Sequence, residues 1–310
     1  MIRRSSLRLA ILTVGAVAVT SGCATFDNSD TVAVVAGTDI TNDEFQELAT
    51  EYFAHPEVFG TAQIVNGRAS AEQSRLLIGA MVRQRQVNQF LDEQGIDASE
   101  IRQAFRQTAL ADTPVAQLSE PMQQLIVDVE EAPTAQALTQ LETPSIDELR
   151  AMYAENPASI GMICAGHILV ETESEALDVL DELAGGADFA TLATERSIDP
   201  TAAENGGALT TGDNQCIPIR NVQQSFDPGF TTGALAAREG IPTQPVESAF
   251  GWHVILHRPW DEIAASVAQL HQPGDSGGYL LDGAIATGEV DVDPRFGTWD
   301  AATRSVTPAG

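Results

Sequence analysis

The chain of 310 residues contains no lysine, and its 16 basic side chains, all arginine, face 44 acidic ones. The formal net charge at pH 7 is −28. A protein this acidic has too few cations to replace the counterions that surround nucleic-acid phosphates. The composition therefore excludes a nucleic-acid partner, and it fits a protein surface that stays soluble outside the cell or in a salty habitat.

Long apolar runs are also scarce. The only marked one, Leu9–Val19, falls short of the ~18 residues that a membrane-spanning helix needs. It follows Arg3, Arg4 and Arg8 and precedes a stretch of small residues. A basic segment, a short apolar core and small residues in this order are typical of a secretion signal.

The small residues Thr20-Ser21-Gly22-Cys23 resemble the lipobox of bacterial lipoproteins, with Thr20 where that motif usually has leucine. We therefore expect residues 1–22 to be a signal peptide. Cys23 would become the lipidated first residue and hold the protein on the outer face of the cell membrane by lipid alone. Simple secretion with an unmodified Cys23 is the alternative.

Cysteine is rare, with three in the chain. Lipidation of Cys23 leaves Cys164 and Cys216 in an oxidising compartment. Two cysteines in such a compartment form a disulfide more often than a reactive site. We expect a Cys164–Cys216 disulfide rather than a catalytic thiol.

The first half of the chain has the pattern of one strand followed by a helical cluster. Residues 31–36 favour a strand, and Thr41-Asn42-Asp43-Glu44 forms a capping box that opens a helix. Apolar residues at helical spacing predict a long helix over about 70–93. Shorter helices are predicted near 98–111, 119–130 and 145–155.

From residue 161 the pattern changes to short strands and helices. Strands are predicted over 162–170, 245–246 and 251–257, with helices over 174–184 and 188–194 between them. A glycine-rich stretch covers 206–212. Towards the end, helices are predicted over 261–270 and 278–287 and a strand over 289–293.

Two histidines occupy the first and last strands of the 161–260 block. His167 precedes Ile-Leu-Val, His253 precedes Val-Ile-Leu, and Asp199 lies in a loop between them. If these strands are neighbours in an antiparallel sheet, both rings lie side by side near the carboxylate. Each neutral imidazole has one donor and one acceptor nitrogen, so two rings and a carboxylate can form a fixed hydrogen-bond chain.

This block resembles the parvulin-type peptidyl-prolyl isomerases. The matching strings are His-Ile-Leu-Val (167–170), Gly-x-x-Phe (186–189), Leu-Ala-x-x-x-Ser (192–197), Asp-Pro (199–200), Gly-Gly-x-Leu (206–209), Pro-Val (245–246) and Phe-Gly-Trp-His-Val-Ile (250–255). The resemblance implies a four-stranded antiparallel sheet with surrounding helices over 161–260. It also implies isomerisation of X-Pro peptide bonds, which requires no cofactor and no metal.

The same resemblance implies the site residues. The catalytic hydrogen-bond network would consist of His167, Asp199 and His253. The side chains that receive the proline ring would be Leu209, Phe226, Phe230 and Phe250. One departure concerns the loop 206–218, where Ala208 and Thr210 replace the aspartate and glycine usual in the family.

The flanks resemble SurA/PrsA-type foldases, through residues 32–41 and the closing segment 291–299, the latter similar to actinobacterial members. The resemblance implies an α+β fold in which the isomerase domain is inserted in a mainly helical chaperone domain. The helical domain would cover 23–160, and residues 261–310 would pack back on it. The implied partners are unfolded or partly folded secreted polypeptides.

Two alternatives have their own signals. The altered 206–218 loop leaves open a holdase chaperone with a degenerate, inactive isomerase module. Residues 274–278, Gly-Asp-Ser-Gly-Gly, match the string around the nucleophile of chymotrypsin-like proteases, with Ser276 in the place of the serine. The protease reading is rejected because no Ala-Ala-His-Cys segment precedes it and a double barrel of ~200 residues does not fit. His271 nearby is expected on the surface.

Overall fold

The computed structural model describes residues 30–60, 64–65 and 68–309. The expected signal peptide (1–22) and Cys23 lie outside the described residues. Within the described ranges, no helix combines the length and the apolar character needed to cross a membrane.

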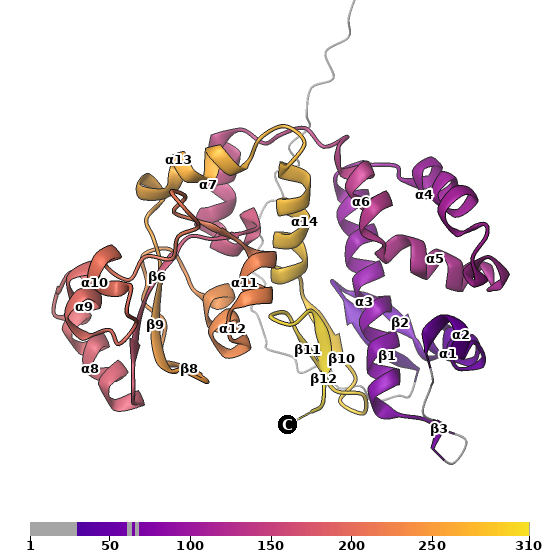
Figure 1. The fold of residues 1–310 in the computed structure, drawn as a ribbon, viewed down its shortest axis with the longest axis horizontal. Coiled ribbons are helices and arrows are strands. Elements are labelled where there is room, and N and C mark those ends of the chain that lie inside the picture. Colours follow the sequence, from indigo (N-terminus) through magenta and orange to yellow (C-terminus); the bar gives the residue numbers. More distant parts are fainter. Residues whose placement is uncertain (1–29, 61–63, 66–67, 310) are drawn as a thin grey trace, which may run out of the picture.

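The chain forms two lobes joined by a central segment (Figure 1). One lobe holds the helices between residues 42 and 138, and the other holds the block that begins near residue 146. Helix α14 (Ser276–Thr287) and the strands β10 (Val290–Val292), β11 (Thr298–Asp300) and β12 (Ser305–Thr307) lie between the lobes. The C-terminal segment thus connects both parts of the molecule.

The first lobe starts with a small sheet that joins the first strand of the described chain to a strand near its C-terminal end. Strands β1 (Thr31–Val35) and β2 (Thr38–Thr41) form an antiparallel hairpin, and β10 pairs antiparallel with the other edge of β1. Helices and short elements follow: α1 (Asn42–Ala54), α2 (Pro56–Phe59), β3 (Ile64–Val65), β4 (Arg68–Ala69), α3 (Ala71–Glu93), α4 (Ser99–Phe105), α5 (Glu120–Val129) and α6 (Glu131–Leu138). The next helix, α7 (Ile146–Glu155), lies in the other lobe (Figure 1).

The capping signals place the helix starts correctly. Thr41 and Glu44 form a reciprocal capping box at α1, and Ser145 and Glu148 do the same at α7. Helix α3 then buries one face, including Ile78 and Val82, against β1 and α5. This packing makes α3 the long support on which the first lobe is built.

The second lobe contains the antiparallel sheet β6-β9-β8. Its elements are β5 (Met162–Ile163), β6 (Ala165–Val170), α8 (Glu173–Ala184), α9 (Phe189–Arg196), α10 (Ala202–Asn205), β7 (Ile217–Pro218), α11 (Ile219–Ser225), α12 (Pro228–Ala236), β8 (Val246–Ser248) and β9 (Gly251–His257). The α+β class and the antiparallel sheet expected from the sequence are confirmed.

One detail of the sheet differs from the prediction. It has three regular strands rather than four. The fourth position is filled by a short irregular segment, in which Leu209 N–H donates to the Ala165 carbonyl (2.9 Å) and His167 N–H donates to the Gly207 carbonyl (2.9 Å). Gly206 and Gly207 both have positive φ, so this segment bends away before a longer strand forms.

A core of apolar side chains fills the space where helix α13 (Trp260–Leu270), α7 and α14 meet, next to the 3₁₀ turn η3 (Pro157–Ile160). His271 is buried there, with 4% of its surface exposed, and its Nε2 lies 3.0 Å from the Ile160 carbonyl oxygen. The expectation of a surface His271 is wrong because α14 and η3 cover it.

Ser276 is the first residue of α14 and is 2% exposed. Its hydroxyl donates to the Gln272 carbonyl oxygen (3.3 Å), and no histidine ring is bonded to it. A side chain in this position offers no accessible nucleophile, so the structure agrees with the rejection of a serine protease.

Candidate active site

The sheet register brings the two histidines together. His167 on β6 lies opposite Ile255 on β9, and His253 on β9 lies opposite Leu169 on β6. The histidines are therefore diagonal neighbours on one face of the sheet, rather than a directly opposed pair. Their ring centroids are 5.4 Å apart, and the ring planes differ by 22°.

A chain of hydrogen bonds runs through both rings and ends at a carboxylate. The distances are 2.7 Å from Ser248 Oγ to His253 Nε2, 3.1 Å between the Nδ1 atoms of His253 and His167, and 2.9 Å from His167 Nε2 to Asp199 Oδ2. An ionised carboxylate only accepts, so His167 Nε2–H donates to Asp199. His167 Nδ1 then accepts from His253 Nδ1–H, which leaves His253 Nε2 to accept from Ser248. Asp199 thereby fixes the tautomers of both neutral rings.

Asp199 is held by its own loop. Ile198 N–H donates to the Leu169 carbonyl oxygen (2.8 Å), which ties the loop to the end of β6. Asp199 Oδ1 accepts from the backbone N–H and the hydroxyl of Thr201, both at 2.8 Å. Burial acts to raise the pKa of Asp199, but the bonds from Thr201 and His167 outweigh it and lower this pKa below its usual range. The carboxylate therefore stays ionised.

Burial keeps both imidazoles neutral. It lowers the pKa of His167 in spite of the opposing effect of Asp199. It also lowers the pKa of His253 to about 4, and the repulsion that would arise if both rings were protonated acts in the same direction. At pH 7 the two rings are thus uncharged hydrogen-bonding groups on the floor of the site.

An apolar pocket of about 470 Å³ lies above these rings. Leu209 and Phe230 are buried in its wall, and the Phe226 ring stacks on Phe230 with centroids 5.4 Å apart. The Phe230 ring meets the His253 ring edge to face at 5.0 Å. Phe250 also lines the pocket but is 70% exposed, so it stands at the mouth.

The altered 206–218 loop is fixed at both ends. At its start, a Cβ on Gly207 would lie 2.4 Å from the His167 carbonyl oxygen, so only glycine allows this close approach to β6. At its end, Cys216 forms a disulfide with Cys164, and Ile217 on β7 pairs with Ile163 on β5. Ala208 and Thr210, which replace residues usual in the family, therefore lie in a segment that is held in place at both ends.

Two residues of the site escaped the sequence analysis. Ser248 completes the hydrogen-bond chain, and Asp227 caps α12, the helix that carries Phe230. Asp227 Oδ2 also accepts from the Ala249 N–H (3.3 Å), which links α12 to the β8–β9 turn. A hairpin over 246–257 would have placed Ser248 beside His253, but the sequence analysis counted only Pro245 and Val246 in the first of its strands.

The described residues contain no cluster of three or more His, Cys, Asp or Glu side chains arranged to hold a metal ion.

Comparisons with known proteins agree with this geometry. Residues 167–258 match the Rotamase family, described as the PPIC-type PPIASE domain. The foldase protein PrsA of Clostridium kluyveri is 39% identical over 106 residues, which cover 34% of this chain and 28% of that protein. PrsA of Halalkalibacterium halodurans is 39% identical over 111 residues, which cover 36% and 30%. These matches span less than a third of the length of either relative.

The crystal structure of PrsA from Bacillus subtilis aligns with 86% of this chain and 95% of that chain, at 17% identity and a TM-score of 0.28. The family match confirms a parvulin-type domain over residues 167–258, and the PrsA matches confirm the similarity to foldases of this type.

Proposed function

We propose that this protein is an extracytoplasmic foldase that isomerises X-Pro bonds in unfolded or partly folded secreted polypeptides and holds these clients while they fold. The observation that carries the proposal is the Ser248–His253–His167–Asp199 hydrogen-bond chain beneath an apolar pocket lined by aromatic side chains.

The reaction needs a shaped site more than reactive groups. Rotation about an X-Pro amide crosses a barrier of ~18–20 kcal/mol and breaks no bond. A site accelerates it by binding the twisted amide better than either planar form. In the twisted amide the lone pair stays on nitrogen, so apolar walls around the ring and a few oriented dipoles favour this state.

Each group in the site has a role in this scheme. Leu209, Phe226 and Phe230 hold the proline ring, and Phe250 covers the adjoining residue at the mouth. The neutral His167 and His253 rings form a rigid polar floor, whose orientation Asp199 fixes. No proton has to move during the rotation.

The rest of the chain is assigned by the same proposal. Residues 1–22 direct secretion, and a lipid on Cys23 holds the protein on the outer face of the cell membrane. Residues 23–160 and 261–310 form the chaperone body, into which the isomerase domain 161–260 is inserted. The antiparallel pairing of β1 with β10 supports this split arrangement.

An isomerase assay on a short X-Pro peptide tests the enzyme. We expect His167→Ala and His253→Ala to lower kcat/KM by about 10-fold or more, because either change disturbs the oriented dipoles that favour the twisted amide. His55→Ala is the control, since His55 lies at the end of α1 and pairs with Glu57. If wild type and the three variants all give only the uncatalysed rate, the protein is not an isomerase.

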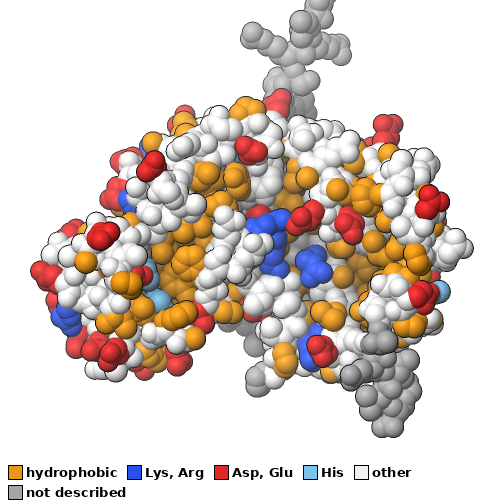
Figure 2. Space-filling view, viewed as in Figure 1, with side chains coloured by type: hydrophobic (Ala, Val, Ile, Leu, Met, Phe, Trp, Pro, Cys, Tyr) orange, Lys and Arg blue, Asp and Glu red, His pale blue; other side chains and the backbone are white. Residues whose placement is uncertain are grey.

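A holdase without isomerase activity is the second candidate. Figure 2 supports client binding, because apolar side chains gather on this face on both sides of the central segment. A measurement of how well the protein suppresses the aggregation of an unfolded client distinguishes the holdase from the isomerase. If the double variant His167→Ala/His253→Ala suppresses aggregation as well as wild type, while wild type fails the peptide assay, the chain is a holdase.

A further inference from the structure

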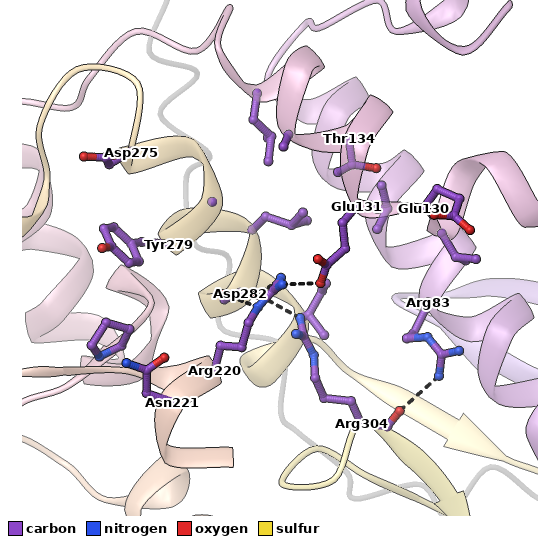
Figure 3. Close-up of a pocket in the computed structure, with 18 of the residues that line it drawn as sticks. Arg83, Glu130, Glu131, Thr134, Arg220, Asn221, Asp275, Tyr279, Asp282 and Arg304 are labelled. Atoms are coloured by element: carbon purple, nitrogen blue, oxygen red, sulfur yellow. Dashed lines mark hydrogen bonds and ion pairs between the residues drawn. The ribbon is translucent and has the colours of Figure 1, made fainter. Parts of the chain in front are cut away.

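A second cavity, of about 600 Å³, lies away from the histidines, between the two lobes. It is bounded by α3 and α6 of the first lobe, by α11 and α14, and by the turn between β11 and β12. Three arginines from three of these elements point into it: Arg83, Arg220 and Arg304 (Figure 3). Such a concentration is notable in a chain with 16 basic and 44 acidic residues.

The carboxylates near these arginines neutralise only part of their charge. Asp282, 5% exposed, accepts from Arg220 Nη2 (3.1 Å) and from Arg304 Nη2 (3.0 Å). Glu131, which is exposed at the rim, pairs with Arg220. Three guanidinium groups thus share two bonded carboxylates, while Glu130 and Asp275 also line the cavity but are exposed at its rim.

Arg83 is the one of these three arginines that has no bonded carboxylate among the described residues. Among the described residues, no carboxylate lies within 4.0 Å of its guanidinium, and its hydrogen bond goes to the backbone carbonyl oxygen of Arg304 (3.3 Å). Burial and the nearby Arg304 cation lower the pKa of Arg83. A half-buried cation beside another cation is unfavourable unless an anion joins them.

Arg304 is held in an uncommon backbone conformation. Its φ is +53°, in the left-handed region that residues other than glycine rarely adopt. This conformation turns both its side chain and its carbonyl oxygen towards the cavity, where they meet Asp282 and Arg83 (Figure 3). Strained positions of this kind concentrate at binding sites.

We propose that this cavity binds a carboxylate carried by a polypeptide, with Arg83 and Arg304 as the groups that receive it. The planar guanidinium matches the two oxygens of a carboxylate. One guanidinium without a bonded carboxylate favours a monoanion over a phosphate dianion, which Glu130 and Asp275 at the rim would repel. Only the choice of a polypeptide as the carrier rests on the proposed foldase function.

The apolar part of the lining fits a peptide rather than a free small anion. Val87, Leu138, Leu281 and Ile285 line the same cavity as the guanidiniums. Figure 2 shows the basic side chains at the centre of the face on which the left lobe exposes histidine. A client chain that occupies the isomerase pocket therefore has a second, anionic anchoring point on the same side of the molecule.

Binding of short fluorescent peptides to the full chain tests this site. The probe is an alanine–serine peptide without proline, made in three forms: with a free C-terminal carboxylate, with a C-terminal amide, and with the amide plus one internal glutamate. We expect the free-acid form or the glutamate form to bind about 10-fold more tightly than the plain amide. Whichever form binds identifies a chain terminus or a side chain as the source of the carboxylate.

Matched variants assign the binding to the cavity. Arg83→Gln should remove the preference for the carboxylate, and Arg83→Lys should keep part of it. Arg75→Gln is the control, since Arg75 lies on the same helix but does not line the cavity. Equal binding of all three peptides, or a preference that survives Arg83→Gln in a folded protein, would overturn the proposal. Because the probes lack proline, neither result depends on isomerase activity.

Discussion

His253 is the residue whose protonation would change the proposed isomerase site most directly. Its neutral ring donates from Nδ1 to His167 and accepts on Nε2 from Ser248. A protonated ring has two donors and no acceptor, so protonation forces the Ser248 hydroxyl to turn and accept, and places a charge beneath the apolar pocket. The site is therefore competent only while this imidazole is neutral.

A pH profile follows from this requirement. The pKa of His253 is lowered to about 4 by burial and by His167, so kcat/KM should be level from pH 6 to 8 and fall on acidification towards pH 4. The measurement is the X-Pro peptide assay at each pH, with circular dichroism to show that the chain stays folded. A profile that already declines between pH 7 and 6 would contradict a depressed pKa.

The lowered pKa of His253 also makes the stability of the folded protein depend on pH. A histidine whose pKa is lower in the folded than in the unfolded state takes up protons mainly on unfolding. The contribution of the neutral His253 to the free energy of unfolding is then fully present above the ordinary pKa of 6.5. It is lost as the pH falls from there towards 4. His257, buried and also lowered to about 4, acts in the same direction.

At the scale of single residues, the prediction that the two histidines lie together followed from the alternation of side chains along each strand. His167 and His253 needed only the assumption that their strands are neighbours, and the structure places them on one face. His271 was misjudged because its burial depends on α14 and η3, which are brought to it only by the tertiary fold. Ser248 was missed because its role depends on the turn between β8 and β9.

At the scale of elements, the sequence predicted those helices whose ends and apolar faces are determined by residues close together in the chain. The capping boxes and apolar spacing located α1, α3 and α7 to within a few residues. The strand β2, the hairpin β11–β12 and the helix α6 were not predicted. They are short, and a two-stranded hairpin or an eight-residue helix is marginal until it packs against the rest of the fold. The predicted helix over 98–111 becomes α4 followed by a π-helical turn, Arg106–Leu110.

The contact between α14 and η3 depends on glycine. A Cβ on Gly283 would lie 2.2 Å from the Ser159 carbonyl oxygen, so Gly283→Ala should push the helix away and cost about 2–3 kcal/mol. Gly278, in the same helix, has no heavy atom within 4 Å of its added Cβ, and Gly278→Ala should stabilise by about 0.5–1 kcal/mol.

Urea denaturation of both variants checks this pair. The midpoint should fall for Gly283→Ala and rise for Gly278→Ala, with little change in the slope. Equal effects of the two substitutions would show that helix propensity, and not the approach of α14 to η3, governs this position.

At the scale of the whole molecule, the charges are unevenly divided between the two cavities. Three arginines and four acidic side chains line the cavity between the lobes, whereas no arginine is among the described residues that line the isomerase pocket. The charged side chains that line that pocket are Asp199 and Asp227, and its histidines are neutral at pH 7. The pocket should therefore attract a cationic client segment, and the cavity between the lobes an anionic one.

The charge of the residue before proline should consequently affect the rate. An interaction with Asp199 and Asp227 across a partly solvated mouth amounts to roughly 1 kcal/mol, so kcat/KM should be about 5-fold higher for an Arg-Pro than for a Glu-Pro peptide. The comparison is made at low and at high salt, since screening should reduce the difference. Asp227→Asn removes one charge while asparagine still caps α12, so it should narrow the ratio without loss of the fold. A Glu-Pro peptide that is the better substrate, or a ratio that Asp227→Asn leaves unchanged, would show that the two carboxylates do not select the client sequence.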